Sequence, residues 1–396
     1  MANNRVIYQS DALFVSKEVR STGAADHAQL RRVQSANYSL TVNRQDVNQF
    51  GQLSRLEAII LESPTVSFDT SYLLGDGFNE MALGFANGAS FNKGFISGQI
   101  ESTSGQNFYI VSAAEGQDVN TTSSNSTNFN TVGIGNAFLT DYTLDASVGS
   151  LPTITVSFEG TNMNGTADIN GGPNGFSGIS GAGINPVDGA VVDTHLTASN
   201  GTTGVLLPAA TGNVAVANTN ETTDDALPTA LRPGDITLSF SNANGDSIVD
   251  ISDGSDGAHV QSVSLSVPHS RTPIERLGSR FAYARVVDFP VVPTLSVSAI
   301  VNETQTNALT DIVNDDAFIS ELQFTFKDSD SSNTPRASYK LKNLKLDSES
   351  FSSSIGPNKT VDLSFSVSIG GPTDLTNNVF FSGTHTGEVL GQTRFA

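Results

Sequence analysis

The 396-residue sequence has no cysteine and no tryptophan. Without cysteine the chain forms no disulfide and offers no thiolate to a metal. Cysteine usage therefore does not distinguish an oxidising from a reducing compartment. No apolar run approaches the roughly 20 residues of a membrane helix. The first five residues, Met-Ala-Asn-Asn-Arg, contain no apolar signal-peptide core. We therefore expect a soluble protein, made in the cytosol, with no membrane partner.

Positive charge is scarce in this chain. The sequence has 20 Lys and Arg against 40 Asp and Glu, which gives a formal net charge of −20. Residues 1–165 and 229–396 carry −7 each, and residues 166–228, which have no Lys or Arg, carry −6. A protein that grips nucleic acid neutralises phosphates with clustered Lys and Arg. The charge therefore argues against such a protein, but not against one that DNA slides past.

The composition favours strands over helices. Only 15% of the residues are charged and 37% are hydrophobic. The chain has 36 glycine residues, and Ser, Thr and Asn are abundant. This mixture is typical of many short strands joined by turns, so we expect an all-β fold with a minor helix. The helix signal is weak in Asp76–Leu83, and in the second half Asn302 offers an N-cap with Gln305 three residues on.

One sequence pattern occurs twice, far apart along the chain. Gln34–Gly51 and Gln261–Gly278 each begin with Gln-Ser, continue through an alternating strand and an arginine, and end at glycine. A Pro-Thr-x-Ser run follows each of them, at Pro64 and at Pro293. A repeat of this length indicates a duplicated domain rather than a solenoid.

The matched order of elements continues to the end of both units. We match Ala137–Asp145 with Tyr339–Asp347, and each segment precedes a closing strand. The sequence therefore predicts one β domain at residues 1–165 and a second, with a C-terminal tail, at residues 229–396. Residues 166–228, rich in Gly, Asn and Thr, form a connector or an accessory excursion.

The matched strands alternate strictly, so their two faces can be read separately. One face is apolar, with Tyr38 and Leu40 among its members, and is expected to pack a core. The other face carries hydroxyls and a few carboxylates, without Lys or Arg, and so offers nothing that replaces the counterions of DNA. We expect DNA to slide along it, and the candidate channel-lining residues are Ser39, Thr41, Thr65, Ser67, Asp69, Ser71, Thr155, Ser157, Glu159, Ser264, Ser266, Thr294, Ser296, Ser298, Asp362, Ser364 and Ser366.

A second interpretation of this polar face stays open. Serine and threonine suit the solvent face of any antiparallel sheet, because such sheets often have one wet face and small β-forming side chains fit it. On that interpretation the face is an ordinary protein surface and carries no function.

No set of residues indicates catalysis, a metal site or another cofactor. The carboxylates of Asp246–Asp256 lack the bidentate glutamate that ends a twelve-residue calcium loop, which favours turn chemistry. We find no nucleophile arrangement and expect no enzyme. The five histidines show no metal-ligand spacing, and we expect them in solvent or in loops: His27, His195, His259, His269 and His385.

The order of elements resembles the tail tube proteins of long-tailed bacteriophages. The resemblance covers about three quarters of the chain, without residues 166–228 and the C-terminal tail. Its motifs are short, and their repeated order is the specific part. They are Val33–Asp46, Asp76–Glu80 and Leu83–Phe85 in the first unit, and Arg232–Asp235, Arg271–Gly278 and Phe289-Pro290 in the second.

This resemblance implies tail-tube-type β-sandwich domains, each with one flanking helix, that assemble side by side into a ring lined by a β-barrel. Two domains per chain imply a homotrimeric, pseudo-hexameric ring, and stacked rings imply the tube of a virion tail, assembled in the host cytoplasm. The implied partners are further copies of the chain, the tape-measure protein and phage genomic DNA in the lumen, and the tail terminator and distal tail proteins. The candidate inter-ring residues are Arg44, Asp46, Arg271, Glu275, Arg276 and Arg280.

The competing hypothesis is a two-domain β-sandwich adhesin or surface-layer protein that binds glycans. It requires aromatic platforms in loops. The sequence has no Trp, and many Phe and Tyr lie on predicted core faces. Rings or filaments with a central hole would separate the two hypotheses.

Overall fold

The computed structural model describes most of the two predicted units and only short parts of residues 166–228. The described residues are 11–16, 27–60, 65–88, 91–101, 105–112, 130–160, 162–166, 179–184, 191–194, 196–197, 205–206, 236–242, 259–275, 282, 284–300, 319–327, 335–352 and 360–385.

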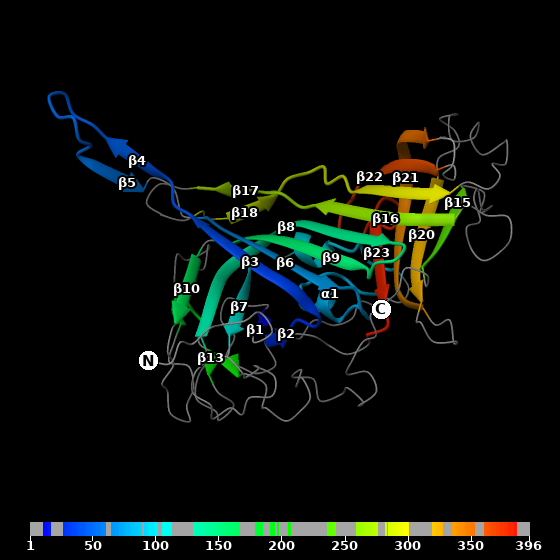
Figure 1. Ribbon diagram of the computed structural model, residues 1–396, viewed down its shortest axis with the longest axis horizontal. Coiled ribbons are helices and arrows are strands. Elements are labelled where there is room, and N and C mark those ends of the chain that lie inside the picture. Colours follow the sequence, from blue (N-terminus) through cyan, green and yellow to red (C-terminus); the bar gives the residue numbers. More distant parts are fainter. Residues whose placement is uncertain are drawn as a thin grey trace.

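The fold is all-β, and eight strands form one continuous antiparallel layer (Figure 1). Their order is β3-β6-β9-β8-β16-β19-β22-β21. The first four strands are β3 (Val33–Thr41), β6 (Thr65–Leu73), β9 (Thr153–Gly160) and β8 (Asn130–Ser147). The last four are β16 (His259–Pro268), β19 (Thr294–Ile300), β22 (Thr360–Val367) and β21 (Pro335–Ser352).

Two of these strands, β8 and β21, are long enough to leave the layer and join further strands below it. Both contain a positive-φ asparagine, Asn136 at 51° and Asn343 at 57°, a conformation that asparagine tolerates better than most residues. The part of β8 up to Ala137 continues the order β10-β8-β7-β1-β2, and the part of β21 up to Leu344 continues β23-β21-β20-β15. These strands are β1 (Asp11–Ser16), β2 (His27–Gln29), β7 (Gln106–Ser112), β10 (Asn162–Thr166), β15 (Ile236–Asn242), β20 (Ile319–Lys327) and β23 (Val379–Gly383).

Hairpins and two short helices complete the described elements. The hairpin of β4 (Arg44–Val47) and β5 (Glu57–Ile60) projects from the body as an arm (Figure 1). The remaining elements are β17 (Arg271–Ile274) with β18 (Ala284–Val287), β11 (Ile179–Ile184) with β12 (Val191–Thr194), β13 (Leu196–Thr197) with β14 (Val205–Leu206), α1 (Phe78–Ala82) and α2 (Ser97–Glu101).

Strand register repeats between the two halves of the layer. Ser39 pairs with Ser67 as Ser266 pairs with Thr294, so each counterpart stands 227 positions later. Both first strands also bulge at a glutamine, Gln34 and Gln261. Likewise β9 and β8 correspond to β22 and β21, with a shift of 207 positions between their paired residues.

Two of the sequence matches are wrong in detail. The bulges at Thr140 and Asp347 correspond, so matching Ala137 with Tyr339 slips by five residues. The counterpart of Ser67 is Thr294 rather than Ser296, a slip of two. Short alternating segments look alike at several shifts, and hydrogen-bond register together with bulges decides among them.

A single core runs beneath both halves of the layer. The apolar faces of β6, β9, β16, β19 and β22 meet the aromatic side chains of residues 78–95 and of β23. Tyr142 on β8 and Tyr339 on β21 share a buried hydroxyl hydrogen bond of 2.6 Å. Tyr38 and Leu40 were expected in the core but are 45% and 48% exposed. They lie on β3, an end strand of the layer, where no strand flanks them on the outer side among the described residues.

The helix prediction at Asp76–Leu83 is confirmed by α1, whereas α2 was not predicted. Asn302 and Gln305 lie outside the described residues. No helix in the described part of the chain is long and apolar enough to cross a membrane.

Candidate functional site

All seventeen predicted channel-lining residues lie on the layer face opposite the core, and none of them is buried. Hydrogen-bond register joins them into rows that run across the strands. One row passes through Ser71, Thr155, Thr143, Ser266, Thr294 and Ser366, and so crosses from the first half to the second without interruption. We call this surface the hydroxyl face. Its position in a channel stays a prediction.

Sequence reasoning missed the part of the hydroxyl face that β8 and β21 supply. Asp141 and Asp145 on β8 pair with Ser157 and Thr153, and neither carboxylate is buried. On β21, Lys345 pairs with Ser366, and Asp347 accepts a 3.0 Å hydrogen bond from the same serine. The alternation of Asp141, Thr143 and Asp145 with apolar residues was the available signal.

The hydroxyl face is therefore anionic but not free of cations. Lys345 is exposed on it. At its margin the Arg285 guanidinium, whose side chain is 5% exposed, lies 2.8 Å from the Glu159 carboxylate. Glu159 pairs with Arg285, and Asp347 lies two residues after Lys345 in the sequence, so the additional residues Asp141 and Asp145 leave the negative charge dominant.

The joint between the two halves is the pairing of β8 with β16. Leu265 pairs with Leu144, and both side chains are fully buried. On the polar side the Ser264 hydroxyl donates a 2.6 Å hydrogen bond to the Asp145 carboxylate. The joint thus has an apolar side toward the core and a hydrogen-bonded side toward the solvent.

The predicted inter-ring residues fall into two groups. Arg44 and Asp46 lie in the exposed arm, where Asp46 forms a 2.9 Å ion pair with Arg55. At the arm tip Phe50 and Leu53 are fully exposed. Glu275 is exposed after β17, and Arg276 and Arg280 lie outside the described residues.

Arg271 has internal partners instead. Its guanidinium donates to the carbonyl oxygen of Gln99 and lies 4.9 Å from the Phe138 ring centroid. Burial lowers the pKa of Arg271 to about 10 and that of the neighbouring His269 to about 4. These contacts tie the β17–β18 hairpin to the body, and the inter-ring role expected for Arg271 stays a prediction.

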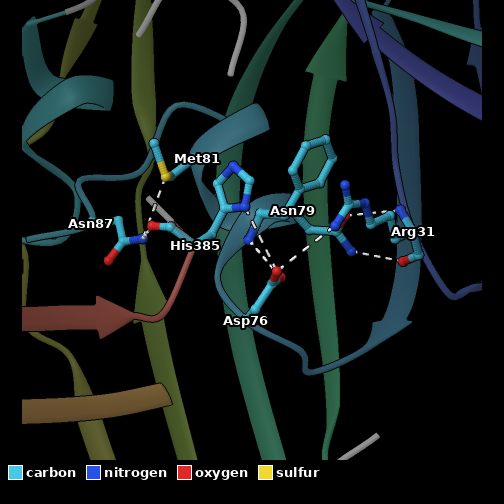
Figure 2. Close-up of polar contacts among 7 residues, drawn as sticks. Arg31, Asp76, Asn79, Met81, Asn87 and His385 are labelled. Carbon is cyan, nitrogen blue, oxygen red and sulfur yellow. Dashed lines mark hydrogen bonds and ion pairs between the residues drawn. The ribbon is translucent and has the colours of Figure 1, made fainter. Parts of the chain in front are cut away.

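A buried polar cluster joins the first half of the chain to its last described residues (Figure 2). The Asp76 carboxylate lies 3.7 Å from both the Arg31 guanidinium and the Nδ1 atom of His385. Asn79 accepts a 2.8 Å hydrogen bond from the Arg31 N–H and donates one of 2.7 Å to the Arg31 carbonyl. The Arg31 guanidinium also lies 3.8 Å from the centroid of the Phe78 ring.

Backbone contacts hold the same region together. The His385 N–H donates a 3.0 Å hydrogen bond to the Asp76 carbonyl, and Asn87 accepts one of 2.7 Å from the Gly383 N–H. A Cβ atom on Gly383 would lie 2.2 Å from the Asp76 carbonyl oxygen. Only glycine allows this approach without moving the backbone. The cluster therefore attaches β23 to the segment before α1.

Glu80 on α1 is fully buried beside this cluster. Its carboxyl accepts a 3.0 Å hydrogen bond from the Tyr72 hydroxyl. Burial raises the pKa of Glu80 from its ordinary value of 4.5 to about 7, against the lowering effect of its hydrogen bonds. Sequence reasoning did not identify this group, because Arg31 and His385 are far from Asp76 and Glu80 along the chain.

The described residues contain no group of three or more His, Cys, Asp or Glu side chains placed to hold a metal ion. His269 and His385 lie in loops, as expected, but both side chains are buried. Asp246–Asp256 and His195 lie outside the described residues, as do the side chains of His27 and His259.

No protein-family model matches the sequence, and no curated protein matches it. Several solved structures match part of the chain. A crystal structure of an Hcp protein covers 37% of this chain and 98% of its own, at 11% identity and a TM-score of 0.24. A protein of a native gene transfer agent virion covers 38% and 97%, at 12% identity and a TM-score of 0.25. One from the anti-feeding prophage baseplate covers 38% and 93%, at 10% identity and a TM-score of 0.25. Matches at this level fix neither the family nor the function.

Proposed function

We propose that this protein is the structural subunit of a bacteriophage tail tube. In this proposal residues 1–165 and 229–396 are two tandem domains of common origin, and three chains form a pseudo-sixfold ring. Stacked rings make a conduit for genomic DNA, bounded at its ends by terminator and distal tail proteins. A tape-measure protein occupies the lumen before DNA passes. The protein belongs to the virion and performs no catalysis.

The observation that carries this proposal is the continuity of the hydroxyl face across the β8–β16 joint. Within one chain, two strand sets of matching register already join edge to edge, with all seventeen candidate residues on one side. Two similar units in one polypeptide reproduce the head-to-tail contact from which closed rings are built. Closing the layer into a ring also removes the open strand edges that invite uncontrolled pairing.

The chemistry of the hydroxyl face suits passage of DNA rather than its retention. A protein binds DNA mainly by releasing condensed counterions with Lys and Arg. The face offers serine and threonine hydroxyls and scattered carboxylates, and its Lys345 is opposite Ser366, whose hydroxyl donates to Asp347. A polyanion is repelled weakly along the whole surface and finds no strong binding position.

Purified protein is expected to form rings or tubes with an open centre. Negative-stain electron microscopy and class averages would show the bore, and the averages are expected to have threefold or pseudo-sixfold symmetry. Size-exclusion chromatography with light scattering gives the number of chains per ring independently. A stable monomer that binds glycans would contradict the proposal and support the adhesin hypothesis.

The hydroxyl face is expected to line the bore. Because the natural chain has no cysteine, Ser296→Cys creates a single attachment site for a maleimide gold cluster. Ser296 is exposed on the face, so gold density should appear inside the ring in averaged images.

Thr384→Cys is the matched control for this labelling. Thr384 is exposed just after β23, a strand that lies outside the eight-strand layer. Its gold label should appear outside the bore. Labels in the reverse positions would show that the hydroxyl face points outward and would remove the electrostatic basis of the proposed function.

A further inference from the structure

The two ends of the eight-strand layer are open strand edges. At one end, residues Ser35–Thr41 of β3 pair with β6. At the other end, residues Ser348–Ser352 of β21 pair with β22. Among the described residues neither segment has a second strand partner. Each open edge presents unpaired backbone N–H and C=O groups that can template pairing with another chain.

The internal joint shows how these two edges fit each other. By register, β16 is the counterpart of β3, and β8 is the counterpart of β21. In the joint, β16 and β8 are antiparallel, with Ser264 opposite Asp145 and Ser266 opposite Thr143. The shifts of 227 and 207 positions convert these pairs into Asn37 opposite Ser352 and Ser39 opposite Ser350.

We propose that β3 of one copy of this chain pairs antiparallel with residues Ser348–Ser352 of β21 in the next copy. The register is Asn37 with Ser352, Ser39 with Ser350 and Thr41 with Ser348. The inference deepens the proposed function and rests on it only for closure of the copies into a ring. It names the partner of both edges, which is a second copy of the same chain.

Differences in burial between counterpart residues support a second copy of the chain as the partner of these edges. Tyr38 and Leu40 on β3 are 45% and 48% exposed, whereas their counterparts on β16, Leu265 and Val267, are fully buried. All four side chains lie on the same face of the layer. Leu265 and Val267 are on a strand with a neighbour on each side, whereas Tyr38 and Leu40 are on a strand with a neighbour on one side among the described residues. Pairing in trans would supply that strand and its apolar side chains. Removing such apolar side chains from water would stabilise the pairing.

Disulfide trapping tests the register directly, because the natural chain has no cysteine. Ser39→Cys with Ser350→Cys in full-length protein should give, under mild oxidation, covalent oligomers on a non-reducing gel. For a trimeric ring the ladder should end at the trimer. Directly opposite residues in antiparallel strands have Cα atoms about 4.5–5.5 Å apart, within the range of a disulfide.

Two control pairs make the result specific. Ser266→Cys with Thr143→Cys places the same pair inside one chain and should give an intramolecular disulfide, which shows that the position itself permits the bond. Asn37→Cys with Ser348→Cys is four residues out of register, a separation of roughly 13 Å along the strand, and should give no cross-link.

The outcomes separate the register from the proposed function. Rings without cross-links from Ser39→Cys with Ser350→Cys, while the internal pair oxidises, would overturn the trans register and leave the tube intact. Covalent oligomers that never close into rings would support the trans register and overturn the tube. Monomers with no cross-link would overturn both.

Discussion

Replacing Asp76 with alanine is expected to lower the free energy of unfolding by about 3–5 kcal/mol, the range for removing one partner of a buried ion pair. The loss removes the Asp76 carboxylate from beside the Arg31 guanidinium, whose side chain is 8% exposed. The variant also loses the 3.2 Å hydrogen bond from the Phe78 N–H at the start of α1. Urea unfolding monitored by circular dichroism measures the change.

The electrostatic state of Asp76 agrees with this expectation. Burial alone would raise the pKa of Asp76, but the hydrogen bond with His385 and the charge of Arg31 outweigh it and hold the pKa below 3.8. The carboxylate is therefore charged at neutral pH and stabilised by its neighbours. Because its pKa is depressed, this contribution is present above pH 3.8 and is lost as the pH falls through the folded-state value.

The matched control is the ion pair of Arg55 with Asp46 in the arm. Its separation of 2.9 Å is shorter than the 3.7 Å between Arg31 and Asp76, but its side chains are 61% and 49% exposed. Exposed pairs contribute about 0–1 kcal/mol, so Asp46→Ala should have little effect. Equal losses for the two variants would show that burial does not decide the contribution of Asp76.

Replacing Glu80 with glutamine is expected to stabilise the protein at alkaline pH relative to the wild type, by up to about 3 kcal/mol. The pKa of Glu80 is raised from 4.5 to about 7, so the folded state binds its proton more tightly than the unfolded state. The stabilising effect of that proton is fully present below pH 4.5 and is lost as the pH rises through about 7. Glutamine stays neutral throughout, and its amide group can still accept from the Tyr72 hydroxyl.

The measurement is the difference in unfolding free energy between Glu80→Gln and wild type, taken from pH 4 to pH 8. A difference is needed because the lowered pKa of His269, about 4, makes wild-type stability rise with pH over part of the same window. Glu57→Gln in the exposed arm is the control variant and should follow the wild type. A flat difference for Glu80→Gln would mean that Glu80 binds its proton no more tightly in the folded protein than in the unfolded chain.

Several features of the fold were predictable because they depend on local period. Alternating residues in strands such as Thr65–Leu73 and Thr153–Gly160 separate a polar face from an apolar one, and the structure places all the polar candidates on one side. Asp76–Leu83 contained a weak helix signal, and α1 lies within it. Side chains of a strand alternate with a period of two in any context, so these assignments need no distant contact.

The register of β8 and β21 was not predictable in the same way. Both strands continue from one layer into another around a positive-φ asparagine, and each has a bulge shortly after it. Short alternating segments resemble one another at several shifts, so matching by sequence slipped by five positions, and only the corresponding bulges fix the register. Asp141 and Asp145 were missed on the hydroxyl face although their alternation with buried Tyr142 and Leu144 is a local signal.

By itself the sequence determined an all-β chain with few cations, a repeated order of strands and one hydroxylated face. The tertiary structure alone decided that Arg31, Asp76 and His385 meet, that Glu80 is buried, and that Tyr38 and Leu40 stay exposed at an open edge. The physical reason is distance along the chain. Alternation is a property of neighbouring residues, whereas burial and ion pairing depend on which layers pack together and on which strand edges find a partner.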